Sequence, residues 1–522
     1  MSFQLTYATM WDPPAEMHQR FDAAADKAQA NLGQRYDCFI DGKDRPAERS
    51  DRLASPIDQD LVTGEFARAT ESEVDLAMRA ANRAFTAWRK MPMDERLGLL
   101  RKAGDILQER VYDLAAALTL EVGKNRMEAL GEAQETVDFF RLYCDHFEKA
   151  GGFIRPLPDD PIEDFRSHNR SVMRPYGAWV VIVPFNFPNA LAGGPVAAAL
   201  VTGNTVVLKG ASTTPLAGRL LADCLRDAGL PPAVFNYVMG SGSVVGEALI
   251  DHPLTAGVTF TGSHETGMRI ARKMIGGTYP RPCIAEMGGK NACIVTANAD
   301  LERAALGIMR SGFGMGGQKC SALSRLYVHE DVADDLITEL QDNMRGITIG
   351  NPIEQKHWLG PLATEDGYRA FGEYCEQLRG GDSRILTGGE YLNDGDLARG
   401  FYVQPTLAEA ADSHPLWQHE MFVPIVMLNR CASNQEAMQK ANDSPLGLTA
   451  GFYGADDEVA WFLDNIEAGV TYANRPQGAT TGAWPGYQPF GGWKGSGNTG
   501  KAIASFYYLQ QYLREQSQTV VE

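Results

Sequence analysis

Four short segments each place one reactive polar side chain among Gly, Pro and apolar residues. They are PFNFP with Asn186, LKGAST with Lys209, AEMGGKN with Glu286 and GGQKCSALSR with Cys320. Catalysis by a thiol needs a base, a donor that stabilises an oxyanion, and a surface that binds the departing group. Each segment supplies a candidate for one of these parts. The four segments therefore favour nucleophilic catalysis by Cys320.

Cys320 and Glu286 also have purely structural interpretations. A cysteine is most often a small buried hydrophobe, and a glutamate after the apolar run 283–285 also fits an exposed strand end. The segment GMGGQKCS is too polar and Gly-rich for a core, which favours a reactive cysteine. No metal site is expected, because no HExxH motif occurs and His414 with His419 lacks a third ligand nearby.

Alternating strand and helix patterns must position these side chains. From residue 177 onward, apolar runs predict strands at GAWVVIV, TVVLK, VFNYV and GVTFTGS, separated by helices over 189–202, 215–228 and 244–251. This alternation predicts an α/β fold with a parallel, doubly wound sheet. Thr213 and Thr214 are candidate N-caps for the helix that starts at Pro215.

Further α/β and helical patterns lie on both sides of this region. Apolar spacing of three and four predicts helices within 71–122 and 128–150, and a second α/β region runs from about 286 to 480. The final stretch, 502–522, carries Tyr507, Tyr508, Tyr512 and Leu513, which we expect to cover another subunit.

Composition narrows the function classes. The chain has 522 residues and a net charge of -18, which argues against nucleic acid as a partner. Eight cysteines without a CxxC motif, and an N-terminus without a signal pattern, favour a cytoplasmic location. The uncharged run 175–208 contains Pro184, Pro188 and Pro195, so we interpret it as a buried β-loop-α-β unit rather than a membrane span.

The ordered motifs resemble the aldehyde dehydrogenase superfamily from about residue 36 to residue 497. The matching motifs are PFNFPNAL, LK at 208–209, FTGSHETG, EMGGK, GQKC, EMFVP and QPFGGWKGSG. The sequence departs from the family at Phe185, where tryptophan is usual, at Val423, where glycine is usual, and in the segment after Lys209.

The resemblance implies a Rossmann-type cofactor domain, a second α/β catalytic domain and a small oligomerisation element. The expected divisions are an N-terminal extension at 1–35, a dinucleotide-binding domain at 36–285 with part of the oligomerisation element near 150–175, a catalytic domain at 286–480, and an anchor loop with a C-terminal oligomerisation segment at 481–522. The implied partners are an aldehyde and further copies of this chain in a dimer or higher homo-oligomer, with neither nucleic acid nor a membrane.

The resemblance also implies a role for each motif residue. Cys320 would attack the aldehyde carbon, the Asn186 amide and the Cys320 N–H would hold the oxyanion, and Glu286 would activate the hydrolytic water. The implied contacts to NAD or NADP are Lys209, Ser212, Ser263, Gly262, Glu420, Phe422 and Phe185. Serine stands at 212 where NAD-using members carry glutamate, which leaves room for a 2'-phosphate and favours use of NADP, alone or alongside NAD.

Within the superfamily, the motifs GQKCSALSR and TTGAWPGYQPFGG most resemble the group that oxidises L-glutamate γ-semialdehyde, the 1-pyrroline-5-carboxylate dehydrogenases. The resemblance implies that Ser321, Gly482 and Ala483 bind the α-carboxylate, that Glu135 meets the α-amino group, and that Phe187 and Phe490 pack on the aliphatic part. Two alternatives remain open: oxidation of another semialdehyde, such as that of succinate or 2-oxoglutarate, and a catalytically silent relative.

Overall fold

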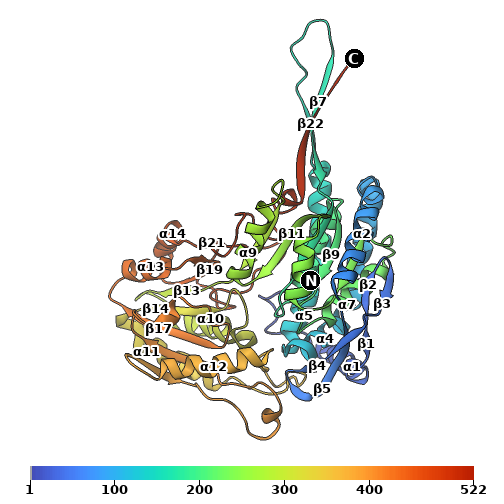
Figure 1. Ribbon diagram of the computed structural model, residues 1–522. Helices are drawn as coiled ribbons and strands as arrows, with labels where there is room; N and C mark the ends of the chain where they lie inside the picture. Colours follow the sequence, from blue (N-terminus) through green and yellow to red (C-terminus); the bar gives the residue numbers. More distant parts are fainter. Residues whose placement is uncertain (1–2) are drawn as a thin grey trace.

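Two seven-stranded sheets, each with its helices, form two lobes of the chain (Figure 1). The computed structural model describes residues 3–522. The first lobe is built on the strand order β12-β11-β8-β9-β10-β2-β3, and the second on β15-β16-β17-β14-β13-β19-β20. Five adjacent strands of the first sheet are parallel, as the alternating pattern predicts.

The strands of the first sheet are β2 (Cys38–Ile40), β3 (Lys43–Arg45), β8 (Ala178–Ile182), β9 (Thr205–Lys209), β10 (Phe235–Val238), β11 (Thr255–Gly262) and β12 (Cys283–Met287). The helices between its parallel strands are α6 (Ala190–Val201), α7 (Leu216–Asp227), α8 (Glu247–Asp251) and α9 (His264–Ile275). β12 extends to Met287, so the division expected at 285/286 falls inside a strand of this sheet.

The strands of the second sheet are β13 (Asn291–Val295), β14 (Leu323–His329), β15 (Ser383–Thr387), β16 (Thr406–Ala410), β17 (Ile425–Cys431), β19 (Thr449–Tyr453) and β20 (Val470–Ala473). Its helices are α10 (Leu301–Phe313), α11 (Ala333–Arg345), α12 (Glu365–Leu378), α13 (Asn434–Asn442) and α14 (Asp456–Asn465). A two-stranded ribbon of β18 (Leu446–Gly447) and β21 (Trp493–Lys494) completes this half of the chain.

The N-terminal part adds α1 (Ala15–Ala30), α2 (Glu71–Trp88), α3 (Met93–Glu109), α4 (Val111–Val122) and α5 (Arg126–Lys149), with a small sheet of β1 (Arg35–Tyr36), β4 (Arg49–Ser55) and β5 (Asp58–Arg68). The predicted helical region 71–122 is thus three helices, and Pro92 caps the second of them. None of the helices within residues 3–522 has the length and apolar character that a membrane span requires.

A three-stranded arm projects from the first lobe (Figure 1). It consists of β6 (Ile154–Leu157), β7 (Ser167–Pro175) and β22 (Leu513–Val521), in the order β22-β7-β6. The C-terminal residues Tyr508, Tyr512 and Leu513 are buried within this chain, and only Tyr507 is exposed. The aromatic rings of Tyr143 and Trp179 pack against Tyr508 and Tyr512. That the stretch 502–522 covers another subunit stays a prediction, and of the four side chains only Tyr507 is exposed for such a contact.

The start of α7 also differs from the sequence prediction. The helix begins at Leu216 with Pro215 as its N-cap, and neither Thr213 nor Thr214 caps it. Instead, the buried carboxylate of Glu121 accepts hydrogen bonds from the N–H groups of Leu216 and Ala217. A side chain 95 residues away in sequence thus satisfies the free helix N–H groups.

Candidate active site

Asn186 and two of the proposed cofactor residues lie where parallel strands of the first sheet end. Asn186 follows β8, Lys209 is the last residue of β9, and Gly262 is the last residue of β11. β9 lies on one side of β8 and β11 on the other, so the chain changes direction at this point of the sheet. Such a switch point leaves a crevice at the carboxyl ends of the strands, which is where open α/β sheets bind dinucleotides.

Lys209 is buried and donates to the carbonyl of Gly210 at 2.8 Å. Burial lowers the pKa of this ammonium to about 8. The bond to this carbonyl uses one N–H of the Lys209 ammonium and leaves its two other N–H donors free, which suits the hydroxyls of a ribose.

Two serines are the remaining candidates on this side of the crevice. Ser212 is exposed and donates to the carbonyl of Gly240 at 3.1 Å. Ser263 caps α9, whose first-turn N–H groups suit a phosphate oxygen.

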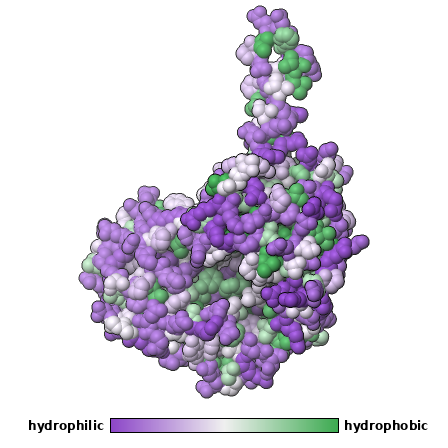
Figure 2. Space-filling model, viewed as in Figure 1, coloured by the Kyte–Doolittle hydropathy of each residue, from purple (hydrophilic) through white to green (hydrophobic). Residues whose placement is uncertain are grey.

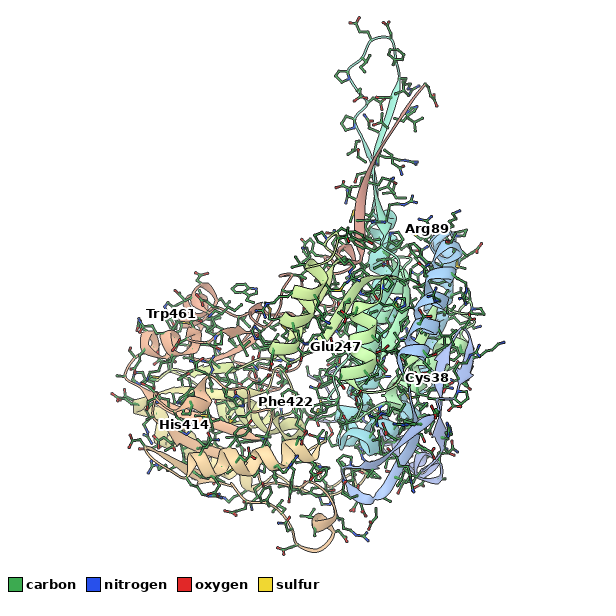
Figure 3. All side chains as sticks on the ribbon, viewed as in Figure 1. Cys38, Arg89, Glu247, His414, Phe422 and Trp461 are labelled. Atoms are coloured by element: carbon green, nitrogen blue, oxygen red, sulfur yellow. The ribbon has the colours of Figure 1, made fainter. Side chains whose placement is uncertain are left out.

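Two further cofactor candidates come from the second lobe. Glu420 accepts a hydrogen bond from the Gly289 N–H at 2.8 Å, which links it to the EMGGK segment. Phe422 has a left-handed φ of 57°, strained for a bulky residue, and its ring packs edge-on against Phe185 with centroids 5.8 Å apart. Figure 2 shows a hollow between the lobes on the viewed face, and Phe422 lies at this hollow (Figure 3).

Side chains of the second lobe hold the loop that carries Cys320, which precedes β14. The Asn291 amide donates to the carbonyls of Cys320 at 2.7 Å and Ala322 at 2.8 Å. The Thr480 hydroxyl donates to the carbonyl of Ser321 at 2.7 Å. A methyl group at Gly289 would lie 2.2 Å from the Cys320 carbonyl oxygen, so only glycine fits there. These contacts restrain the backbone of the proposed nucleophile.

The Cys320 thiol lies close to two carboxylates. Burial raises its pKa to about 12, and the charges of Glu420 and Glu286 add to this effect. Burial also raises the pKa of Glu286 to about 8, and its Oε2 atom has no hydrogen-bond partner among the described residues. A carboxylate with a free oxygen and a pKa near neutrality is suited to act as a general base.

Asn186 is buried and donates through Nδ2 to the carbonyl of Gln318 at 2.9 Å, two residues before the cysteine. An amide nitrogen has two N–H donors, so one remains for a further acceptor. The loop that carries Asn186 is held by Glu132 of α5, whose carboxylate accepts the N–H groups of Asn189 at 2.7 Å and Ala190 at 3.1 Å. This geometry gives Asn186 the means to stabilise an oxyanion beside Cys320.

One pocket is lined by Cys320 together with all six residues proposed to bind substrate. These are Glu135, Phe187, Ser321, Gly482, Ala483 and Phe490, which come from α5, the loop after β8, the cysteine loop and the 477–490 segment. Gly482 has a left-handed φ of 101°, a conformation that a residue with a side chain rarely adopts. The anchor-loop backbone is thereby presented to the pocket.

Several pocket residues are absent from the sequence-based prediction. They are Tyr7, Met10, Trp11, Arg310, Lys319 and Trp484. The N-terminal residues among them belong to the extension, which carries no recognisable motif. Lys319 precedes Cys320 and pairs with Glu128 of α5 at 2.9 Å. Its position in the GQKC motif is the one signal for Lys319 in the sequence.

Comparison with known proteins places this geometry in context. Residues 45–518 match the aldehyde dehydrogenase family. This chain belongs to that family. It is therefore an NAD(P)-dependent aldehyde dehydrogenase, and the resemblance drawn from its motifs is confirmed.

Similar proteins include two curated relatives named 1-pyrroline-5-carboxylate dehydrogenase, from Geobacillus thermodenitrificans and Geobacillus kaustophilus. Each is 37% identical over 512 residues, which is 97% of this aldehyde dehydrogenase and 96% of the relative. A solved structure of 1-pyrroline-5-carboxylate dehydrogenase from Thermus with bound NAD has a TM-score of 0.93 and 30% identity, and covers 100% of this chain and 99% of that one. Betaine aldehyde dehydrogenase from Staphylococcus aureus in complex with NAD+ has a TM-score of 0.88 at 27% identity, with 96% and 97% covered.

Proposed function

We propose that this aldehyde dehydrogenase oxidises L-glutamate γ-semialdehyde, the open form of 1-pyrroline-5-carboxylate, to L-glutamate, a step of proline catabolism. The observation that carries the proposal is the pocket, which combines the Cys320 thiol with the Glu135 carboxylate and the polar groups of Ser321 and Gly482. An amino-acid aldehyde needs these three features: a nucleophile, an anion for its ammonium, and donors for its carboxylate. The names of the relatives support the same substrate.

In the first half of the proposed reaction, the Cys320 thiol releases its proton to solvent and its sulfur bonds to the aldehyde carbon, while the electron pair of the C=O bond moves to the aldehyde oxygen. The free N–H of Asn186 and the Cys320 backbone N–H stabilise the oxyanion that forms on the aldehyde oxygen. A donor of this kind supplies ~2.7 to 4 kcal/mol. NAD or NADP, held by Lys209, Ser263 and Glu420, would supply the hydride acceptor for the same carbon, and Cys320 would then carry the acyl group as a thioester.

In the second half, water hydrolyses the thioester. Glu286 takes a proton from that water, the water oxygen bonds to the acyl carbon, and the Cys320 thiolate leaves. The product carboxylate and the restored cysteine complete the cycle. The free Oε2 atom of Glu286 supports this role, because both of its lone pairs are available to a water molecule and its proton.

The substrate test compares kcat/KM for glutamate γ-semialdehyde, succinate semialdehyde and propanal, by following reduced cofactor at 340 nm. We expect the first to be oxidised with the highest kcat/KM, because propanal offers neither an ammonium for Glu135 nor a carboxylate for Ser321. Equal efficiency across the three, or a preference for succinate semialdehyde, would contradict the proposed substrate.

We further propose that the enzyme uses NADP, alone or alongside NAD. Ser212 is exposed near Gly240, and its short hydroxyl leaves room for a 2'-phosphate where a glutamate would repel it. We expect Ser212→Glu to lower kcat/KM for NADP selectively, by about tenfold or more, while that for NAD changes little. A native enzyme that does not use NADP would overturn this proposal.

We also propose that the protein is a cytoplasmic homo-oligomer of at least two chains, assembled through the arm. All eight cysteines are free, which fits a reducing compartment. The arm exposes apolar side chains at Ile162 and Phe165, which are 53% and 57% exposed, and green atoms mark it in Figure 2. We divide the chain between the lobes after β12, which ends at Met287.

A further inference from the structure

The N-terminal extension forms part of the wall of the substrate pocket. Tyr7, Met10 and Trp11 line the pocket beside Cys320 and Glu135, although they precede the first helix of the chain. The pocket is therefore not complete without the N-terminal segment, which packs on the core of the first lobe.

Tyr7 joins the two parts of the pocket that would hold opposite charges of an amino acid. Its hydroxyl donates to Oε2 of Glu135 at 2.8 Å. A methyl group at Gly482 of the anchor loop would lie 3.4 Å from the Tyr7 Cβ atom, and one at Gly131 of α5 would lie 3.0 Å from the ring. The ring also packs edge-on against Trp484, with centroids 5.0 Å apart. Tyr7 thus contacts both α5 and the anchor loop.

The hydroxyl leaves the second carboxylate oxygen of Glu135 available. Within residues 3–522, Oε1 of Glu135 has no hydrogen-bond partner, and this atom is not fully buried. The charges that face this carboxylate are Lys124, Glu132 and Asp138. Burial raises the pKa of Glu135 to about 8, and the Tyr7 hydroxyl opposes that rise because it stabilises the charged form.

A second contact holds the same segment in place. The Arg310 guanidinium lies over the Trp11 ring, 3.7 Å from its centroid, and donates to the carbonyl of Pro476 at 3.1 Å. Because Trp11 rests on α10 and Tyr7 rests on α5, the segment is fixed at two points across the pocket. A cation–π contact of this kind and an aromatic pair each contribute on the order of 1 kcal/mol.

We propose that Tyr7 is a substrate-positioning residue, whose hydroxyl orients Glu135 so that its free oxygen receives the α-ammonium of an amino-acid semialdehyde. The inference rests on the proposed function and deepens it, because it names the group that makes the pocket selective for an amino acid over the same aldehyde without the amino group. Tyr7 acts through Glu135 and takes no part in the chemistry at Cys320.

The test compares Tyr7→Phe with the unchanged enzyme on two substrates, glutamate γ-semialdehyde and glutarate semialdehyde, which lacks only the α-amino group. We expect Tyr7→Phe to lower kcat/KM for the amino substrate by about tenfold, mainly through KM, since it removes one hydrogen bond to a charged group. The value for glutarate semialdehyde should change by less than about twofold. Tyr487→Phe is the matched control, because its hydroxyl binds Gln4 of the same segment from outside the pocket.

A second variant tests whether Tyr7 works through Glu135. Glu135→Gln should reproduce the selective loss, and adding Tyr7→Phe to it should cost little more, because the two changes remove one function. An equal loss on both substrates, or fully additive effects, would overturn the inference. If the native enzyme does not prefer glutamate γ-semialdehyde over glutarate semialdehyde, the proposed function itself is overturned. The two failures are therefore distinguishable.

Discussion

At the scale of single residues, Glu286 and Cys320 are adjacent acids whose charged forms are both disfavoured by burial. The pKa of the thiol is raised to about 12 and that of the carboxyl group to about 8. Each negative charge opposes the other, so the thiolate and the carboxylate are not both favoured in the resting enzyme. This arrangement suits a cysteine that becomes reactive when substrate and cofactor are in place.

The raised pKa of Glu286 predicts the pH dependence of thioester hydrolysis. A general base works as the carboxylate, so below pH 8 the rate of hydrolysis should rise about tenfold per pH unit and then level off above pH 8. Glu286→Gln should lose this dependence and show a burst of reduced cofactor followed by slow turnover. Stopped-flow absorbance at 340 nm from pH 6 to pH 9 measures both effects.

Cys320→Ala is the control for that experiment. It should show neither burst nor turnover, because no thioester forms, while cofactor binding measured by calorimetry persists. Slow hydride transfer in Glu286→Gln, with no burst, would assign Glu286 a different role.

At the scale of elements, α5 supports the whole active site from one face. Glu128, Glu132 and Glu135 are spaced four and three residues apart, which places them on the same side of the helix. Glu128 pairs with Lys319 beside the nucleophile, Glu132 holds the loop of Asn186, and Glu135 enters the substrate pocket. A single helix thus holds two loops and contributes a carboxylate to the pocket between them.

Glu132 forms a fully buried ion pair with Lys124, and the contribution of this pair to the stability of the protein can be tested. The Lys124 Nζ atom lies 2.5 Å from Oε2 of Glu132. Glu132→Ala leaves the lysine uncompensated, which should cost ~3–5 kcal/mol, lower the melting temperature by several degrees and reduce kcat through the displaced Asn186 loop. Thermal unfolding followed by circular dichroism and steady-state assays measure these effects.

An exposed pair provides the comparison. Lys27→Ala removes the ion pair with Asp113, whose two side chains are 64% and 41% exposed. Since water screens such pairs, the loss should be below about 1 kcal/mol and activity should be unchanged. A Glu132→Ala enzyme as stable as Lys27→Ala would mean that the buried pair does not hold the loop.

At the scale of the whole molecule, the arm is the part that the chain itself leaves uncovered. β22 runs antiparallel to β7 over nine residues, and its other edge has no strand beside it in the described chain. A long free edge offers unpaired N–H and C=O groups to a strand of another copy, and the arm adds the exposed apolar side chains of Ile162 and Phe165. This is the physical basis for the proposed oligomer.

Charged residues on the arm should separate the subunits. The double change Ile162→Asp and Phe165→Asp should convert the oligomer to monomers, because burying two carboxylates at an apolar interface is unfavourable. Light scattering during size-exclusion chromatography measures the mass. Leu463→Asp, on α14 of the second lobe, is the control and should leave the mass unchanged. An unchanged mass in the arm variant would place the interface elsewhere.

The sequence by itself determined the family, the candidate catalytic residues and the parallel strands that carry them. Cys320, Glu286 and Asn186 lie in short motifs, and a loop of a few residues after a strand has few ways to orient its side chain. Alternating apolar runs were enough to predict parallel strands, because both faces of such a strand must be buried. The family followed from these local features.

Only the tertiary structure decided which distant groups complete the site. Tyr7 meets Glu135 across 128 residues, Glu121 caps α7 in place of the nearby threonines, and Tyr508 and Tyr512 pack inside their own chain. Each of these contacts joins segments without a shared motif, and each forms because a buried polar group or aromatic ring must find a partner within the packed interior. The local sequence shows which polar groups and aromatic rings of a segment need a partner once they are buried, whereas the tertiary structure determines which distant residue is that partner.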